Sequence, residues 1–234
     1  MRPQLFLLHF AGGNGYSFQF LLPEINTFFE THVLELPGRG RRIEEPLLYS
    51  KPDALQDVFR QIKEKRNGSP YLIYGHSMGA SLGLLLTSEM EKLQDPPVCF
   101  IPTGNAGPGV SRKKDRYKMP QEAFIAELKI LGGVPDEVFE NKEIFDFFEP
   151  VLRADFEIVE KEFEYPKGFT LHTPIIALMG SDEEDSDKIE NWKNYTHNRF
   201  QSQLLKGDHF FIHRHKQTLA SMLKNAYRQY LPVG

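Results

Sequence analysis

The chain has 234 residues, with 28 Lys and Arg against 32 Asp and Glu, for a formal net charge of -4. Hydrophobic residues make up 40% and charged residues 26%, which is the composition of an ordinary globular protein and gives no basic excess for a nucleic-acid partner. Its single cysteine, Cys99, excludes an internal disulfide framework and a cysteine-rich zinc site, and it fits a reducing compartment such as the cytoplasm.

The N-terminal segment is apolar from Leu5 to Leu8. This run is too short for a membrane span, which needs about 20 apolar residues, and no small-residue cleavage site of a signal peptide follows it. We therefore interpret Gln4–Phe10 as a buried strand, with no room before it for the antiparallel strands that often open related folds. No longer apolar run follows, so we expect no membrane partner. We also expect a monomer that acts in the cytoplasm.

Short apolar segments then alternate with helical stretches. The predicted strands are Gln4–Phe10, His32–Leu36, Pro70–Tyr74, Val98–Pro102, Pro174–Met179 and Phe200–Leu205. The predicted helices are Tyr16–Phe29, Pro52–Arg66, Met78–Leu93, Ser186–Thr196 and His215–Tyr230. Because most of the strands are continuously apolar, they are typical of parallel strands covered on both faces. The alternation predicts an α/β fold with a mostly parallel sheet of about six strands.

Residues 109–168 interrupt this alternation. They contain no convincing strand, and we predict three helices there, at Pro120–Leu131, Pro135–Phe148 and Glu149–Tyr165. A long helical insertion between two strands is typical of a lid, so we divide the chain into a core of residues 1–108 and 169–234 and a lid of residues 109–168. The lid is rich in phenylalanine, which either lines an apolar cavity beneath it or packs it against the sheet; the sequence leaves both open.

The strongest chemical signal is Gly75-His76-Ser77-Met78-Gly79, a G-x-S-x-G pentapeptide. It lies between a predicted strand and a predicted helix, which is the context of a nucleophile elbow. In such a turn the serine backbone is strained, and a side chain at either glycine would collide with the neighbouring strand or helix. We therefore predict Ser77 as a nucleophile at the carboxyl edge of the sheet.

A nucleophilic serine needs a base and an acid, which in this context follow in the order Ser, Asp or Glu, His. His209 lies between the last predicted strand and the final helix, and we predict it as the base. Four carboxylates at positions 182–185 follow the strand Pro174–Met179. Only Asp182 and Glu183 are close enough to the strand end to be held rigidly, and both stay open as the acid.

An oxyanion hole requires two converging N–H groups. One is predicted from Met78, directly after the nucleophile, and the second from Ala11 in the glycine-containing loop His9-Phe10-Ala11-Gly12-Gly13. A phosphate-binding loop is the rival interpretation, but the chain has no G-x-G-x-x-G and no Gly-Lys-Ser/Thr here.

Several motifs occur together along nearly the whole chain: His9–Gly13, Leu36-Pro37-Gly38-Arg39-Gly40, the serine elbow, Leu131-Gly132-Gly133-Val134-Pro135, Leu152-Arg153-Ala154-Asp155, Trp192 and Gly207-Asp208-His209-Phe210-Phe211. In these motifs and their order the chain resembles the type II thioesterases of polyketide and nonribosomal peptide synthetases, and their mammalian relative, the medium-chain acyl-carrier-protein thioesterase.

This resemblance implies an α/β-hydrolase core with a helical lid, and hydrolysis of acyl or peptidyl thioesters on the phosphopantetheine arm of a carrier protein, in editing or in chain release. It implies no metal and no cofactor of the enzyme's own. The family's acid usually lies three residues after the glycine that ends the strand and is Asp. Ungapped counting then favours Glu183, whereas residue type favours Asp182.

The aromatic residues Phe10, Phe124, Phe145 and Phe148 are predicted to line the acyl site. Two other functions stay open: a serine esterase or acyl-CoA hydrolase acting on free small substrates, and a non-catalytic carrier-binding protein, against which the intact Ser77 and His209 argue.

Carrier proteins are typically acidic, so a local basic patch has to attract them to this mildly acidic chain. The cluster at residues 112–118, with Arg112, Lys113 and Lys114, is the first candidate and a solvated loop is the alternative. Arg39, Arg41 and Arg42 form a second cluster, which a structural role would equally explain.

Overall fold

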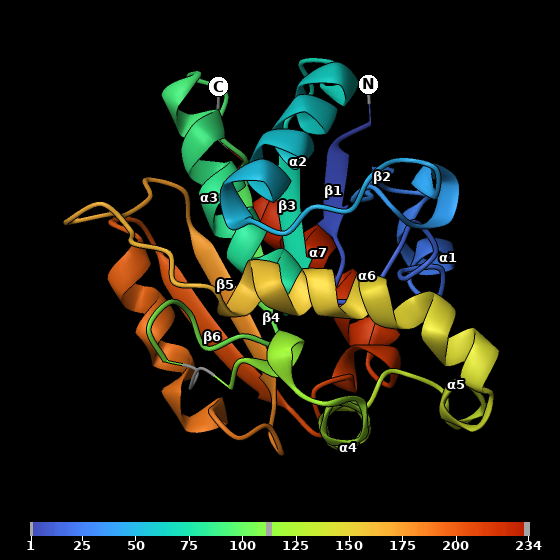
Figure 1. Ribbon diagram of the computed structural model, residues 1–234. Coiled ribbons are helices and arrows are strands. Elements are labelled where there is room, and N and C mark those ends of the chain that lie inside the picture. Colours follow the sequence, from blue (N-terminus) through green and yellow to red (C-terminus); the bar gives the residue numbers. More distant parts are fainter. Residues whose placement is uncertain (1, 111–113, 232–234) are drawn as a thin grey trace.

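The computed structural model describes residues 2–110 and 114–231 and contains a six-stranded parallel sheet with the order β2-β1-β3-β4-β5-β6 (Figure 1). The strands are β1 (Gln4–Leu8), β2 (Glu30–Leu34), β3 (Tyr71–His76), β4 (Cys99–Thr103), β5 (Ile175–Gly180) and β6 (Phe200–Leu205). Each lies within two residues of its predicted bounds. The mostly parallel sheet of about six strands that the sequence predicted is thereby confirmed.

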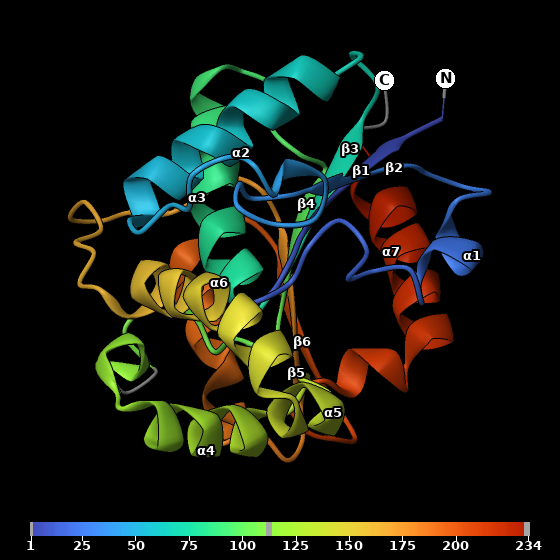
Figure 2. The same ribbon diagram turned by 45° about the vertical axis from the view of Figure 1, so that its right-hand side comes forward.

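Helices cover both faces of the sheet (Figure 2). One face carries α2 (Lys51–Lys65), α3 (Met78–Lys92) and the 3₁₀ helix η3 (Ser186–Tyr195), and the other carries α1 (Leu22–Ile25) and α7 (Lys216–Tyr230). Because successive strand side chains point to opposite faces, Phe6 and Leu8 of β1 pack towards α2 and α3 while Leu5 and Leu7 pack towards α7.

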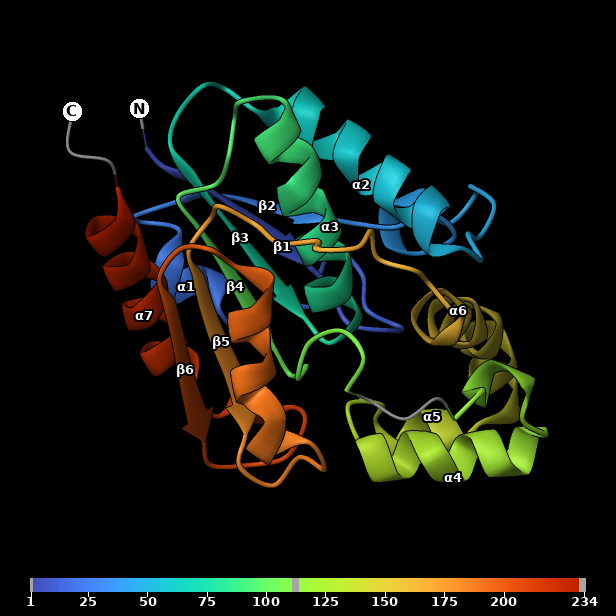
Figure 3. The same ribbon diagram turned by 90° about the vertical axis from the view of Figure 1, so that its left-hand side faces the viewer.

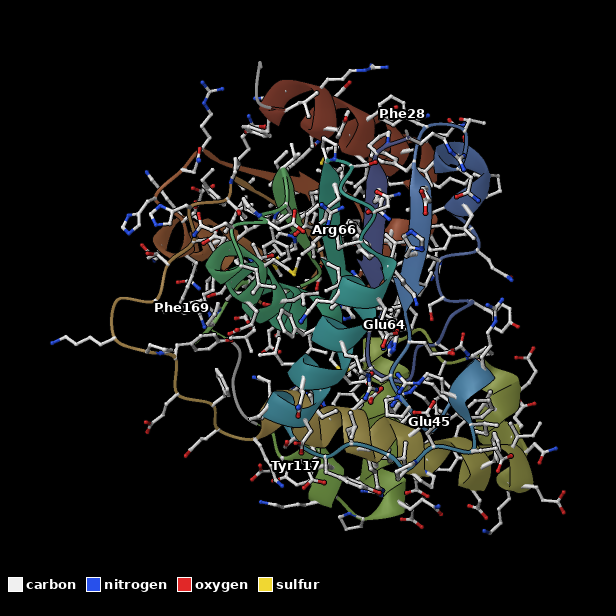
Figure 4. The ribbon with its side chains drawn as sticks, turned by 90° about the horizontal axis from the view of Figure 1, so that it is seen from above. Phe28, Glu45, Glu64, Arg66, Tyr117 and Phe169 are labelled. Atoms are coloured by element: carbon white, nitrogen blue, oxygen red, sulfur yellow. The ribbon has the colours of Figure 1, made fainter. Side chains whose placement is uncertain are left out.

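The view from above shows these layers from the amino edge of the sheet (Figure 4). Phe28 lies beside α7, where its ring contacts Tyr227 with 5.7 Å between centroids, and Tyr117, which belongs to the helical insertion, lies on the opposite side. The carboxyl ends of the strands point away from this viewpoint, so the site predicted from the sequence lies at the far edge of the sheet.

The predicted helix Tyr16–Phe29 is wrong over most of its length. Only Leu22–Ile25 is α-helical, and the residues before it form successive turns, with Ser17 N–H donating to Asn14 and Leu21 N–H to Phe18. Pro23 explains the late start, because proline cannot supply an N–H to a preceding helical turn but is well suited to the first turn of a helix.

The insertion of residues 109–168 lies beyond the carboxyl edge of the sheet (Figure 3). It contains α4 (Gln121–Leu131), α5 (Asp136–Glu140) and α6 (Lys142–Glu160), with a 3₁₀ turn η2 (Arg116–Lys118) before them. Further 3₁₀ turns, η1 (Gly40–Arg42) and η4 (Phe211–His213), lie in core loops. Among the described residues of the insertion there is no strand.

The predicted division of the insertion at Phe148 and Glu149 is wrong. The break lies at Asn141, whose side chain accepts hydrogen bonds from the N–H groups of Glu143 and Ile144 and so caps α6. Helix α6 then continues through Pro150 and ends at Glu160, before the predicted Tyr165. A proline inside a helix costs about 3 kcal/mol, which the burial of one face of α6 offsets, with Leu152 and Phe156 in the insertion's own core.

None of the helices that the structure describes is long and apolar enough to cross a membrane.

Candidate active site

The pentapeptide around Ser77 forms the strained turn between β3 and α3. Ser77 has φ 57° and ψ -111°, a left-handed conformation that is rare outside glycine. A Cβ at Gly75 would lie 2.1 Å from the carbonyl oxygen of Gly79, and a Cβ at Gly79 would lie 2.1 Å from that of Leu8 in β1. Both clashes are with backbone, so only glycine fits at either position, and Ser77 is the one half-exposed residue in this buried turn.

Glu183 and His209 meet at the ends of the adjacent strands β5 and β6. Glu183 Oε2 lies 2.6 Å from His209 Nδ1, and Glu183 Oε1 accepts the N–H of Gly180 at 2.7 Å. The Glu183 side chain is 8% exposed and that of His209 18% exposed. Asp182 is exposed and accepts a hydrogen bond from the hydroxyl of Ser181 instead. The geometry therefore favours Glu183 over Asp182 as the partner of the histidine.

The two loops that carry Glu183 and His209 are fixed against each other by backbone contacts. Ser181 N–H donates to the carbonyl of Leu205 at 2.7 Å, and Asp182 N–H donates to that of Gly207 at 2.9 Å. A Cβ at Gly180 would lie 2.3 Å from the carbonyl oxygen of Asp208. This close approach holds the acidic turn at a constant distance from His209.

His209 also packs against the elbow. The centroid of its ring lies 5.1 Å from that of His76. Both rings pack against Gly104, where any side chain would clash, because a Cβ there would lie 2.4 Å from His76 Cε1. Burial lowers the pKa of His76 well below its usual value, and the nearby His209 lowers it further. His76 is therefore a neutral ring, and no second charge competes with a protonated His209.

Ser77 and His209 line one cavity of about 620 Å³ at the carboxyl edge, although no hydrogen bond joins the serine hydroxyl to the ring in the described part of the chain. This volume is within the range of small-molecule sites. The apolar part of the wall includes Leu128, Leu131, Val138, Leu152, Phe156, Val159 and Met179. The insertion therefore supplies most of the apolar surface that faces Ser77.

Only two of the four phenylalanines predicted for the acyl site line this cavity. Phe10 and Phe148 do so, the latter with 39% exposure. Phe124 and Phe145 are fully or almost fully buried in the insertion's own core and do not line the cavity. The apolar residues of these helices either pack in the insertion's own core or line the cavity, and the sequence pattern did not show which of them lie on the side of Ser77.

Sequence reasoning missed the contacts that two residues, Phe210 and Asn105, make near the site. Phe210 packs its ring against Phe10 and reaches Gly133, where a Cβ would lie 2.1 Å from its Cζ, so this loop touches the insertion. Asn105 donates from Nδ2 to the carbonyl of Ser77 at 3.3 Å, and Trp192 Nε1 donates to the carbonyl of Asn105 at 2.6 Å. The glycines at positions 132 and 133, and those at 104 and 107, were the signals in the sequence that another segment approaches the backbone closely at these places.

The two predicted oxyanion donors belong to different segments: Met78 directly follows Ser77, and Ala11 lies in the loop after β1, which lines the same cavity as Ser77. Met78 is the first residue of α3, so its N–H is one of those without an acceptor inside the helix. In the other loop, Gly12 N–H donates to Asp155 and Gly13 N–H donates to the carbonyl of Phe10. Ala11 N–H has no protein acceptor among the described residues and is therefore available to a ligand.

The basic segments are less free than the sequence suggested. Arg116 pairs with Glu127 and Glu160, and Lys114 pairs with Glu127 at 3.4 Å and with Glu184 at 3.9 Å. Arg112 and Lys113 lie outside the described residues. In the second cluster, Arg39 pairs with Asp155, Arg42 with Glu45 and Asp57, and Arg41 is exposed.

Within residues 2–110 and 114–231, no group of three or more His, Cys, Asp or Glu side chains is arranged to hold a metal ion.

A parallel sheet whose elbow serine, histidine loop and acidic turn converge at its carboxyl edge, beneath a helical insertion, is the architecture of an α/β-hydrolase. The family model of the thioesterase domain matches residues 3–227. The chain belongs to the thioesterase family and is a hydrolase of the thioesterase type.

Relatives extend over nearly the whole chain. The gramicidin S biosynthesis protein GrsT of Aneurinibacillus migulanus is 29% identical over 94% of this chain and 87% of its own length. The protein named linear gramicidin dehydrogenase LgrE of Brevibacillus parabrevis is 28% identical over 97% of this chain and 88% of its own length. The crystal structure of ClbQ from the colibactin NRPS/PKS pathway superposes with a TM-score of 0.91 at 26% identity, covering 100% of both chains.

Proposed function

We propose that this protein is a type II thioesterase that hydrolyses acyl or peptidyl thioesters from the phosphopantetheine arm of a carrier protein. The observation that carries the chemistry is the 2.6 Å contact of Glu183 with His209 in the cavity that Ser77 lines. The substrate class is supported by the names of similar proteins, which place GrsT in gramicidin S biosynthesis and ClbQ in the colibactin NRPS/PKS pathway.

In the proposed reaction His209 takes the proton of Ser77 Oγ as the oxygen attacks the thioester carbonyl carbon. The N–H groups of Met78 and Ala11 stabilise the oxyanion of the tetrahedral intermediate. The C–S bond then breaks, His209 returns its proton to the leaving thiolate, and an acyl-serine remains. Water, deprotonated by the same ring, attacks the acyl-serine and releases a carboxylic acid and free Ser77. Glu183 orients the ring and stabilises its protonated form.

The apolar part of the cavity wall is suited to an acyl chain. Leu152 and Phe156 belong to it, and Phe148 lies at an exposed part of the same wall, while charged side chains line other parts of the cavity. In this proposal residues 109–168 act as a lid over the cavity. The enzyme needs no cofactor of its own, because the phosphopantetheine arm belongs to the substrate. It acts as a monomer in the cytoplasm.

Carrier docking near residues 112–118 stays a prediction. The described members Lys114 and Arg116 are paired with carboxylates that line the cavity, so they stabilise its wall. Lys118 is the exposed cation of this segment within the described residues, with 61% of its side chain accessible.

The decisive experiment compares one acyl group on two carriers. Hydrolysis of an acyl-carrier-protein thioester is measured against that of the acyl-CoA with the same acyl chain. We expect a kcat/KM at least 10-fold higher for the carrier-protein substrate. Equal values would assign the chain to acyl-CoA hydrolysis, and no hydrolysis of either thioester would remove the catalytic proposal.

A further inference from the structure

A buried ion pair joins the core to the insertion next to the loop His9–Gly13, which carries the proposed oxyanion donor Ala11 and is called the oxyanion loop below. Arg39, in the loop after β2, places Nη1 at 2.5 Å from Asp155 Oδ2 and Nη2 at 2.8 Å from Oδ1. Asp155 belongs to α6 and is fully buried, and the Arg39 side chain is 5% exposed. The two residues are 116 positions apart, so this contact exists only when α6 is docked on the core.

Asp155 has a second partner, which belongs to the oxyanion loop. Its Oδ2 accepts the N–H of Gly12 at 2.7 Å. One turn earlier on α6, Leu152 packs on the same glycine so closely that a Cβ at Gly12 would lie 2.5 Å from its Cδ2. Helix α6 therefore holds Gly12 by both a charged hydrogen bond and a steric contact.

The peptide unit on the other side of Ala11 is held from within the core. The carbonyl of Phe10 accepts from His9 Nδ1 at 2.8 Å and from Gly13 N–H at 2.9 Å. His9 Nε2 accepts the N–H of Leu36 at 3.3 Å, which places the proton of the ring on Nδ1. Because C=O and N–H point in opposite directions across a trans peptide, holding the Phe10 oxygen also aims the Ala11 N–H.

Ala11 thus lies between two fixed peptide planes. The Phe10–Ala11 plane is held by His9, and the Ala11–Gly12 plane is held by Asp155 through the Gly12 N–H. Both backbone dihedrals of Ala11 are then determined. Gly12 has φ 76°, a region open to glycine, so this plane could rotate if Asp155 did not hold it.

We propose that Asp155, held in place by Arg39, is a positioning residue for the oxyanion hole: docking of α6 on the core fixes the Ala11–Gly12 peptide plane and so completes the fixation of Ala11, whose N–H is aimed by the contact of His9 with the Phe10 carbonyl. This inference rests on the proposed serine-hydrolase function. Stability alone is a weak reason for such a pair, because replacing a buried ion pair by apolar residues of similar volume is often neutral or stabilising. An apolar pair could not accept the hydrogen bond of the Gly12 N–H, so this bond is a reason for the carboxylate that stability does not give.

The test is the double variant Arg39→Met with Asp155→Leu. It replaces the pair by apolar side chains and so avoids an unpaired buried charge, yet it leaves Gly12 N–H without its acceptor. We expect a melting temperature close to that of the wild type, a KM within about 3-fold and a kcat lowered about 10- to 100-fold, since losing one oxyanion donor outright costs about 10²- to 10³-fold.

A transition-state analogue gives a second readout that a purely structural role would not move. The affinity for an acyl trifluoromethyl ketone, whose serine adduct carries an oxyanion, should fall by the same factor as kcat/KM. Asp95→Asn is the matched control: it breaks the bidentate pair of Asp95 with Arg66 at the amino edge of the sheet, the edge that faces the viewer in Figure 4, and should leave kcat unchanged.

A wild-type kcat in the double variant overturns the positioning role. Should that variant fail to fold, Arg39→Met with Asp155→Ala removes the same acceptor with a smaller side chain; an unchanged kcat there overturns the role as well, whereas a lowered kcat at constant KM supports it. Labelling of wild-type Ser77 by a fluorophosphonate separates the two proposals. If wild-type hydrolysis does not depend on Ser77, the proposed function fails; if it does and the variants match the wild type, only the role of Asp155 fails.

Discussion

The carboxyl edge of the sheet and the helical insertion both face the cavity, but different forces hold their residues in place. At the sheet edge, backbone meets backbone: Gly75, Gly79 and Gly180 each leave no room for a Cβ. In the insertion, side chains pack on side chains around Phe124 and Leu128, and the insertion meets the core through separate contacts such as Arg39 with Asp155.

This difference has a functional consequence. A backbone clash cannot be relieved by a change of rotamer, so Ser77, Glu183 and His209 keep their relative positions. A side-chain core tolerates exchange of one apolar residue for another of similar volume. We therefore expect changes at the sheet edge to affect turnover and changes in the insertion to affect which acyl group is accepted.

The largest effect is expected for Ser77→Ala. Removing the proposed nucleophile should lower kcat about 10⁴- to 10⁶-fold while the fold survives, because alanine fits in the space of serine. Steady-state hydrolysis of an acyl-carrier substrate measures the loss, and the melting temperature checks the fold. A variant with near-normal turnover would show that the sheet edge does not carry the chemistry.

The next effect distinguishes the two carboxylates. Glu183→Gln should lower kcat about 10²- to 10⁴-fold, because the amide does not hold the imidazole of His209 in its working tautomer or stabilise its protonated form. Asp182→Asn is the matched control one position away and should stay within about 3-fold of the wild type, since its side chain is exposed. Equal, mild losses in both variants would contradict Glu183 as the acid.

The core should also respond to pH through His9. Burial lowers the pKa of His9 from 6.5 to about 4, and the nearby Arg39 adds to this effect. The unfolded chain therefore binds the proton first as the pH falls, so the stability due to neutral His9 is fully present above pH 6.5 and is lost as the pH falls to about 4. The shift corresponds to about 3 kcal/mol of unfolding free energy.

Urea unfolding of the wild type and of His9→Gln measures this contribution. The difference between the two free energies of unfolding should shrink from pH 7.5 to pH 4.5, because only the wild type carries the buried imidazole. A difference that is independent of pH would show that His9 is not held neutral.

The smallest effect concerns selection by the insertion. Phe148→Trp enlarges a side chain in the cavity wall and should shift the preferred acyl length, with a several-fold change in kcat/KM between short and long chains. Phe124→Trp is the matched control in the insertion's own core and should lower the melting temperature without moving the preferred length. A shift in both variants, or in neither, would mean that the wall of the cavity does not select the acyl chain.

Much of the fold followed from local sequence. The β3 strand, the Ser77 elbow and helix α3 are contiguous, so glycine sterics and apolar patterning within about 20 residues determined them. His209 was predicted in the same way, because it lies in the short loop after the last strand. Local signals did not predict the helix bounds near two prolines. Pro150 lies inside α6, because packing of that helix offsets its cost, and Pro23 lies in the first turn of α1, which starts later than predicted.

Tertiary structure decided the contacts between distant segments. The preference for Glu183 over Asp182 comes from the direction in which a turn aims two adjacent carboxylates, and only the approach of the loops after β5 and β6 fixes that direction. The pair of Arg39 and Asp155 likewise joins two motifs that the sequence showed only as separate signatures. Composition and periodicity report what a residue prefers locally, whereas a partner more than 100 positions away is determined by the folded chain.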